Sequence, residues 1–152
     1  MRMSDFVVRE AIMPSLEATT KEDVIRELIQ QLATAKQIAA EDVEEIVSAI
    51  QRREALGSTG IGRGVAIPHT KHPCVEKLVG TVAISDPGVP FESLDGEPVH
   101  VFVLLVSPQN AHGDHLRALE NISKKLRDDL FVKSLRAADT PELIWGHLED
   151  EA

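Results

Sequence analysis

Sulfur and aromatic side chains are scarce in this sequence. Cys74 is the single cysteine, which excludes an internal disulfide and fits a reducing compartment. Four phenylalanines, one tryptophan and no tyrosine leave little material for stacking bases or sugars on aromatic rings. The longest apolar run, at 99–106, is too short to cross a bilayer, and Met1–Glu10 lacks the apolar segment of a signal peptide. We therefore expect a cytoplasmic protein with no direct membrane insertion.

Basic residues are also in the minority. The chain has 16 Lys and Arg side chains against 25 Asp and Glu, which gives a formal net charge of −9. A surface of that sign disfavours binding to nucleic acid or to anionic membranes. It suits a partner protein with a basic patch, or it simply keeps the protein in solution. The length of 152 residues, 43% of them hydrophobic, predicts one globular domain over 1–152.

Hydrophobic spacing predicts the secondary structure. Apolar residues at helical spacing, with cap residues such as Thr20 and Thr140, predict helices over about 20–35, 41–54, 112–127, 130–137 and 141–148. Apolar runs predict strands at Val65–Ile67, Leu78–Ile84 and 99–106, and an edge strand at Val89–Phe91 within the turn-rich stretch Ser85–Pro98. Residues 5–18 show little pattern. Helices on both sides of a block of strands indicate an α/β fold with a central sheet.

A glycine-rich run leads directly to a histidine. Residues 57–64, called here the glycine run, are followed by a short apolar strand, then by Pro68 and His69. Proline fixes its own φ and pushes the preceding Ile67 into an extended conformation. We therefore expect the strand to stop at Pro68 and to leave His69 at a stiff strand end. Imidazole is well suited to gaining and losing a group near neutral pH.

Two further polar side chains continue apolar stripes on helices. Arg53 follows Ile46 and Ile50 on the stripe of its helix, just before the glycine run. It either caps the helix C-terminus, where a cation is favoured, or serves as an anion clamp delivered to the glycine run. His115 lies four residues before Leu119 and so falls on the inward face of the first turn of its helix.

Four kinds of chemistry compete for the glycine run and the histidines. A dinucleotide site is excluded, because the glycine spacing is wrong and the run leads from a helix into a strand, the reverse of the required order. A P-loop is excluded, because no Lys-Ser/Thr pair follows the glycines and a helix should come next. Zinc binding remains as a remote alternative, on the ligand types His69, His72, Cys74 and His115. Histidine phosphorylation needs a nucleophilic imidazole and a clamp for phosphoryl oxygens. His69, Arg53 and the N–H groups of the glycine run can supply both.

The remaining histidines have simpler interpretations. We expect structural roles for His72, His100, His112 and His147. His100 alternates within the central apolar strand and is expected to be packed or satisfied by a local hydrogen bond.

Several stretches together resemble the EIIA domain of the phosphotransferase system, in its fructose, mannitol and nitrogen-regulatory group. The similarity extends over nearly the whole chain. It rests on Arg53–Leu56, the glycine run with Val65–His69, Pro90–Phe91, Leu94–Val99, and His115–Leu116 with Leu119 and Ile122–Ser123. The stretch Lys71-His72-Pro73-Cys74 lies outside this pattern.

The resemblance implies both a fold and a function. The family fold is a three-layer α/β/α sandwich around a mixed, mostly five-stranded sheet. His69 matches the phosphorylated histidine, on Nε2, and Arg53 and His115 match its site partners; no cofactor or metal is implied. Members of the family are phosphotransferase components that receive phosphate from HPr, which enzyme I charges from phosphoenolpyruvate. The acceptor is an EIIB cysteine or, in regulatory members, a target protein reads the phosphate.

The amino-acid sequence of the glycine run resembles that of the nitrogen-regulatory and fructose members more than that of the mannitol members. We therefore expect a free-standing EIIA of the regulatory type, with a sugar-transport EIIA as the alternative.

Overall fold

The most apolar stretch of the sequence forms the centre of a mixed sheet. In the computed structural model, which describes residues 1–149, strand β5 (Val99–Ser107) is buried along its length except at His100, as its sequence predicts. It pairs antiparallel with β4 (Val79–Val89) and parallel with β2 (Val65–Ala66) and β3 (His69–Lys71). A fifth strand, β1 (Gly60–Gly62), pairs antiparallel with β2.

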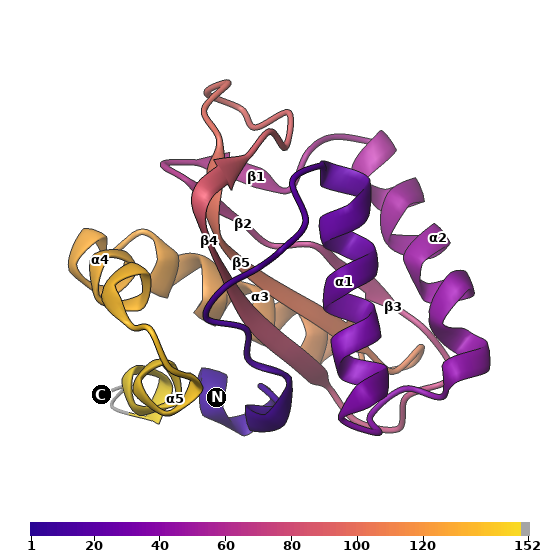
Figure 1. The fold of residues 1–152 in the computed structure, drawn as a ribbon. Helices are drawn as coiled ribbons and strands as arrows, with labels where there is room; N and C mark the ends of the chain where they lie inside the picture. The colour runs from indigo at the N-terminus through magenta and orange to yellow at the C-terminus, as the bar shows by residue number, and fades with distance from the viewer. Residues whose placement is uncertain (150–152) are drawn as a thin grey trace.

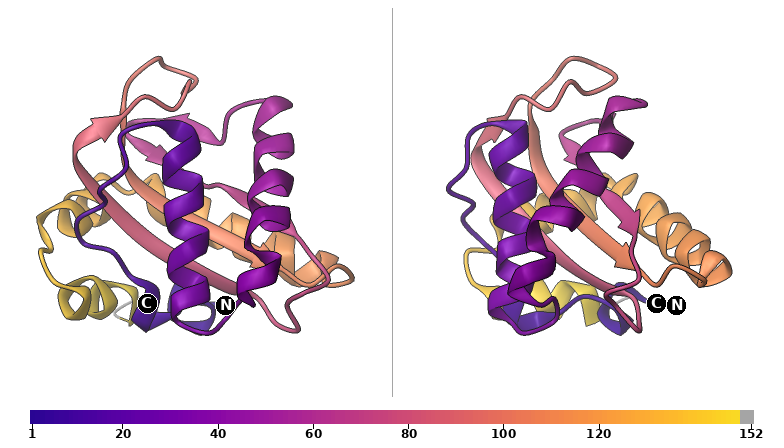
Figure 2. Two further views of the ribbon diagram at one scale, coloured as in Figure 1. Left: turned by 45° about the vertical axis from the view of Figure 1, so that its right-hand side comes forward. Right: turned by 90° about the vertical axis from the view of Figure 1, so that its right-hand side faces the viewer.

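Helices cover both faces of this sheet (Figure 1). On one side α1 (Lys21–Thr34) and α2 (Val43–Ala55) lie side by side, and on the other lie α3 (His112–Leu126), α4 (Asp129–Ala137) and α5 (Pro141–Glu149) (Figure 2). Alternate residues of the strands supply two cores. One contains Ala66, Phe102 and Leu104 with α1 and α2, and the other contains Val65, Val101 and Val103 with α3 to α5. The three-layer sandwich with a mixed five-stranded sheet is thus confirmed.

Polar side chains cap the starts of α1 and α5. The hydroxyl of Thr20 accepts from the backbone of Asp23, and that of Thr140 accepts from Leu143, each at 3.2 Å. The second helix begins later than predicted, because a 3-10 turn (Ala40–Asp42) precedes it. Within residues 1–149 no helix is both long and apolar enough to cross a membrane.

The N-terminal stretch has a role that its weak pattern did not reveal. Two 3-10 turns (Met3–Asp5 and Arg9–Ala11) carry the chain along the outer edge of β4. Backbone N–H groups of Val8, Met13 and Leu16 donate to carbonyls of that strand at 2.8–2.9 Å. Only isolated bridges form, so no alternation of polar and apolar residues marks this pairing in the sequence.

The prediction for the turn-rich stretch after residue 84 was only partly correct. Strand β4 continues through it to Val89, which pairs with Val99 after a register shift beyond Ile84. The predicted edge strand at Val89–Phe91 is wrong, because Pro90 and Phe91 lie outside any strand. The ring of Phe91 is buried instead and meets Phe102 edge-on, with ring centroids 5.4 Å apart. An irregular strand that keeps its pairing across a Pro-Gly pair resembles a turn in the sequence.

The glycine run builds a hairpin. Gly62 faces Val65 across β1 and β2, so Arg63 and Gly64 alone form the connection. Both have positive φ, 60° and 80°. That combination is the type I′ geometry preferred in two-residue hairpins. Strand β1 was not predicted, since a Gly-Ile-Gly sequence has little strand propensity of its own.

Candidate functional site

His69 begins strand β3, beyond a short interruption in the pairing. Val65 lies opposite Val101 in β2, and His69 lies opposite Leu105 in β3, so both pairings with β5 share one register. Strand β2 therefore ends before Pro68, as expected, but pairing with β5 resumes at His69 in a separate strand, which the sequence did not predict. Proline lacks the N–H, yet its carbonyl still accepts from Leu105 at 3.0 Å. The backbone that carries His69 is held by the sheet on both sides of the interruption.

The imidazole of His69 has a defined protonation pattern. Its Nδ1 lies 2.7 Å from the carbonyl oxygen of Ile67, and a carbonyl can only accept, so Nδ1 carries the proton. In the neutral ring the lone pair is then on Nε2. Burial, aided by the positive charge of Arg53, lowers the pKa of His69, against the raising effects of the Ile67 carbonyl and of Glu54. The half-buried ring is therefore neutral and nucleophilic at pH 7.

His115 lies beside it. The two ring centroids are 5.6 Å apart and the rings are tilted by 55°. Its Nδ1 is 2.7 Å from the hydroxyl oxygen of Ser107, at the end of β5, and the residue is only 7% exposed. Burial, and then the neighbouring charges of His69, Lys71 and His112, lower the pKa of His115 to about 4. The fold thus brings together two histidines that are 46 positions apart in the sequence, as the inward stripe of α3 predicts.

The buried neutral ring of His115 makes a prediction for stability. In the unfolded chain, His115 binds a proton as the pH falls below its ordinary pKa of 6.5. In the folded protein it binds that proton only when the pH reaches about 4. The free energy of unfolding should therefore decrease across that interval, by up to about 3 kcal/mol in total. Urea unfolding of wild type and His115→Asn at several pH values measures this. Equal pH slopes in the two proteins would contradict it.

Arg53 is partly buried in the last turn of α2. Its Nη1 donates to the carbonyl of Gly57 at 2.8 Å, the contact expected of a helix-end cation. Its charge also acts on His69, where it is one of the causes that lower the pKa. Both interpretations of this arginine drawn from the sequence are therefore compatible with its position.

The N–H groups at the start of the glycine run are occupied. The N–H of Gly57 donates to the backbone carbonyl of Glu54, and the N–H of Thr59 donates to the side chain of Glu54. The N–H of Gly60 donates to the hydroxyl of Ser58. These N–H groups are therefore not free to clamp a phosphoryl group, contrary to the expectation from the sequence. The run instead positions β2 and β3.

Glu54 is the residue that the sequence analysis missed at this place. It is buried at the C-terminal end of α2, where it binds Thr59 and forms an ion pair with Lys21. A signal was present, since Glu54 lies four residues after Ile50 and so shares the buried stripe. A carboxylate at such a position must find partners.

Lys71 and His112 also lie at the edge of the site. Lys71 alternates with His69 on β3, and its Nζ lies 2.8 Å from Nδ1 of His112 at the start of α3. An ammonium can only donate, so this nitrogen of His112 accepts. Neither residue was expected here from the sequence. The i, i+2 spacing of Lys71 from His69 was the available signal.

The zinc alternative does not survive. Only His69 and His115 of its four ligands come together. The ring of His72 is buried with its Nδ1 accepting from the backbone of Cys74 at 3.1 Å and its Nε2 3.1 Å from a carboxylate oxygen of Glu45. Within the part of the chain that the structure describes, no three His, Cys, Asp or Glu side chains are grouped to hold a metal ion. His100 is satisfied locally, as expected, by the Ser85 carbonyl at 2.9 Å.

Comparison with known proteins finds relatives over almost the whole chain. The family described as "Phosphoenolpyruvate-dependent sugar phosphotransferase system, EIIA 2" matches residues 5–151. A nitrogen regulatory protein of Bradyrhizobium diazoefficiens is 39% identical over 148 residues, which cover 97% of this chain and 95% of that protein. The crystal structure of the nitrogen regulatory protein IIA-Ntr from Neisseria meningitidis superposes with a TM-score of 0.86 at 29% identity, covering 96% of this chain and 98% of that one.

A further solved structure shares the fold. The mannitol EIIA of Escherichia coli, in complex with phosphorylated mannitol EIIB, superposes with a TM-score of 0.77 at 21% identity, over 93% of this chain and 96% of that one. Given the match over residues 5–151, the chain belongs to the EIIA 2 family of the phosphoenolpyruvate-dependent sugar phosphotransferase system.

Proposed function

We propose that this chain is an EIIA phosphocarrier of the nitrogen-regulatory type, acting as one domain over 1–152 in the cytoplasm. It accepts a phosphoryl group from phospho-HPr on Nε2 of His69 and passes it to an EIIB cysteine or uses it as a regulatory signal. The observation that carries this proposal is the hydrogen bond from Nδ1 of His69 to the Ile67 carbonyl, because it leaves the lone pair on Nε2.

The transfer itself is a displacement at phosphorus. The lone pair of Nε2 forms a new N–P bond while the bond between phosphorus and the donor breaks, and its electron pair leaves with the donor. The ring of His69 gains positive charge in this step. Its Nδ1 proton remains against the Ile67 carbonyl, which favours the charged ring. No proton has to leave Nε2 before attack. Repeated turnover requires enzyme I and HPr, which supply the phosphoryl group from phosphoenolpyruvate.

Arg53 and His115 are the groups we assign to the phosphoryl oxygens. A guanidinium offers a planar fork of donors to an anion. When the Ser107 hydroxyl donates to Nδ1 of His115, the proton of the neutral ring is on Nε2, where it can donate to a phosphoryl oxygen. His115 thus assists the phosphoryl group without carrying it.

Exposed leucines flank these residues in the sequence. Leu56, three positions after Arg53, is 86% exposed, and Leu116, next to His115, is 62% exposed. Large apolar side chains at the rim of a site are typical of a surface that docks another protein. We propose that they contact HPr and the acceptor protein in turn.

The regulatory role is favoured over sugar transport by one comparison. The 39% identity to the Bradyrhizobium nitrogen regulatory protein extends over almost the full length of both chains. Transport remains the second candidate, since a mannitol EIIA with the same fold is known in complex with phosphorylated EIIB. A pull-down that recovers only an EIIB, equally from the phosphorylated and unphosphorylated protein, would count against regulation.

The test of the phosphocarrier function is direct. Purified protein is incubated with phosphoenolpyruvate, enzyme I and HPr, and its intact mass is measured. We expect the gain of one acid-labile phosphoryl group that depends on all three components. No gain in mass would overturn the proposal.

Substitution of Arg53 distinguishes a phosphoryl clamp from a helix cap. Arg53→Lys and Arg53→Ala should both slow phosphorylation of His69 by roughly 10- to 100-fold, the effect of losing one charged hydrogen bond. Thermal stability should change little, since a helix-end cation contributes only about 0.3–1 kcal/mol. The initial rate of mass gain measures the effect, with Arg52→Lys in the same turn as control. A wild-type rate in Arg53→Lys would favour a simple helix-end cation.

A further inference from the structure

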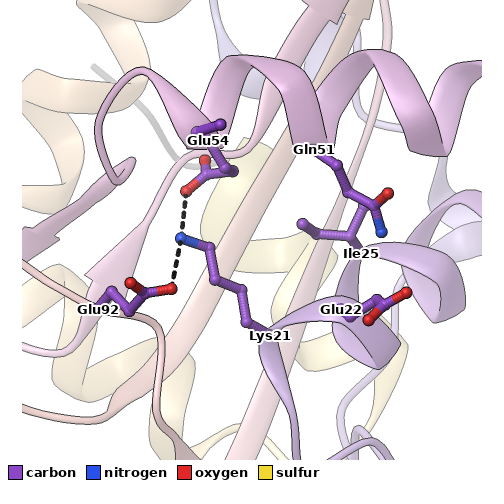
Figure 3. Close-up of a pocket in the computed structure, with 7 residues that line it drawn as sticks. Lys21, Glu22, Ile25, Gln51, Glu54 and Glu92 are labelled. Carbon is purple, nitrogen blue, oxygen red and sulfur yellow. Dashed lines mark ion pairs between the residues drawn. The ribbon is translucent and has the colours of Figure 1, made fainter.

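A buried carboxylate lies directly behind the site. The side chain of Glu54 is only 4% exposed and belongs to the last turn of α2, next to Arg53. Its Oε1 accepts from the backbone N–H of Thr59 at 3.1 Å and lies 3.0 Å from Nζ of Lys21, and its Oε2 accepts from the hydroxyl of Thr59. Figure 3 shows Lys21 reaching from α1 to lie between Glu54 and Glu92. Both oxygens of the carboxylate therefore have partners.

Lys21 is itself held in place. Its Nζ lies 3.8 Å from a carboxylate oxygen of Glu92 and 4.7 Å from the centroid of the Phe91 ring. Its side chain is 19% exposed. The positive charge beside the buried side chain of Glu54 is therefore held by three contacts, as a buried ion pair requires.

A short series of hydrogen bonds connects Glu54 to the proposed nucleophile. Glu54 binds both the N–H and the hydroxyl of Thr59, and the carbonyl of Thr59 accepts from the N–H of Ile67 at 3.1 Å. The carbonyl of Ile67 then accepts the Nδ1 proton of His69 at 2.7 Å. Ile67, whose carbonyl binds His69, is thus held at its own N–H by Thr59, and Thr59 is held by Glu54.

The negative charge of Glu54 acts in the same direction. It is among the causes that favour the charged ring of His69. Attack on phosphorus by a neutral imidazole produces such a ring, so a fixed carboxylate nearby lowers the energy of the charge that develops.

We propose that Glu54 is a positioning residue for His69: clamped by Lys21, it fixes Thr59 and Ile67, and through them the tautomer and direction of the imidazole. This inference rests on the proposed phosphocarrier function. In this role, Lys21 and Glu54 act on catalysis indirectly, through His69, in addition to their contribution to the packing of α1 against α2.

The alternative is that the Lys21–Glu54 pair only joins two helices. The chain offers a matched control, because Arg26 of α1 also forms an ion pair with Glu44 of α2, on the solvent side. Glu44→Gln removes an ion pair between the same two helices without touching Thr59. Its phosphorylation rate and its His69 signals should remain those of wild type.

The decisive variant is Glu54→Gln, which keeps the shape and removes the charge. We expect kcat for phosphorylation by phospho-HPr to fall about 10-fold or more with little change in KM, since alignment and not docking is lost. In the unphosphorylated protein, the ¹⁵N NMR signals of His69 should show a lower pKa and a larger share of the Nε2–H tautomer. Thr59→Val, which removes only the hydroxyl bond, should shift both readouts in the same direction by less.

Each outcome decides the question. A Glu54→Gln protein with lower stability but with wild-type kcat, pKa and tautomer of His69 would overturn the positioning role. If Glu54→Gln does not fold, Thr59→Val carries the same test. If wild type accepts no phosphoryl group, the phosphocarrier proposal fails alone, because the NMR signals of His69 still report whether Glu54 orients the ring.

Discussion

Replacing His69 by alanine is expected to abolish phosphorylation of this protein. The nucleophile would be missing, and the neighbouring His115 cannot take over, because its ring is buried at the first turn of α3. A residue that is only 7% exposed leaves no room for in-line attack on a phosphoryl group carried by another protein. We expect no mass gain in His69→Ala after incubation with phosphoenolpyruvate, enzyme I and HPr.

The matching variant, His115→Ala, should behave differently. It keeps Nε2 of His69 and so should still accept phosphate, but it lacks the hydrogen bond that we assign to the phosphoryl oxygens. Slower transfer to an acceptor, or a shorter lifetime of the phosphoprotein, is the expected result. If His115→Ala matches wild type in loading, discharge and lifetime, His115 is structural. If His69→Ala loads and His115→Ala does not, the nucleophile is His115.

The largest loss of stability is expected from Gly80→Ala, near the start of β4. A Cβ at this position would lie 2.6 Å from the backbone oxygen of Leu104 in β5 and 3.3 Å from a ring carbon of Phe6. The first contact is with backbone in the middle of the sheet, which cannot move without breaking the β4–β5 pairing. We expect a loss of about 3 kcal/mol or more in the free energy of unfolding.

Gly146→Ala is the matched control for that substitution. Gly146 lies within α5, and a Cβ there would meet no atom within 4 Å. Because alanine is the better helix former, a gain of up to about 1 kcal/mol is expected. Urea unfolding of both variants measures the two effects. Wild-type stability in Gly80→Ala would mean that β4 and β5 separate easily at this point.

The elements that the sequence predicted well are those with strong, regular spacing. The stripe Leu119, Ile122 and Leu126 identified α3, and the unbroken apolar run of β5 identified the centre of the sheet, because burial on one or both faces determines such patterns. The same periodicity pointed His115 inward, and the structure places it against His69. The helical spacing around His115, together with the family resemblance, was therefore enough to predict that these two histidines lie close together.

Features that depend on backbone hydrogen bonds were not predictable in this way. Strand β1 and the N-terminal bridges to β4 are set by pairing with other segments, and their side chains carry no alternation. Resumption of pairing at His69 depends on a register set by β5, while Pro68 in the sequence indicates only a local break. In the glycine run, the N–H of Thr59 donates to a side-chain oxygen of Glu54 at 3.1 Å, a contact between backbone and side chain that residue spacing alone does not predict.

The N-terminal segment along β4 also restricts how a partner can bind. Exposed strand edges are templates on which another chain can add a strand of its own. Here the residues from Val7 to Leu16 already occupy the outer edge of β4 through their own backbone bonds. A partner protein therefore cannot extend the sheet along this part of the edge by β-augmentation. Recognition of partners on that side must come from side-chain surfaces, so partner choice can change by substitution without any change in backbone pairing.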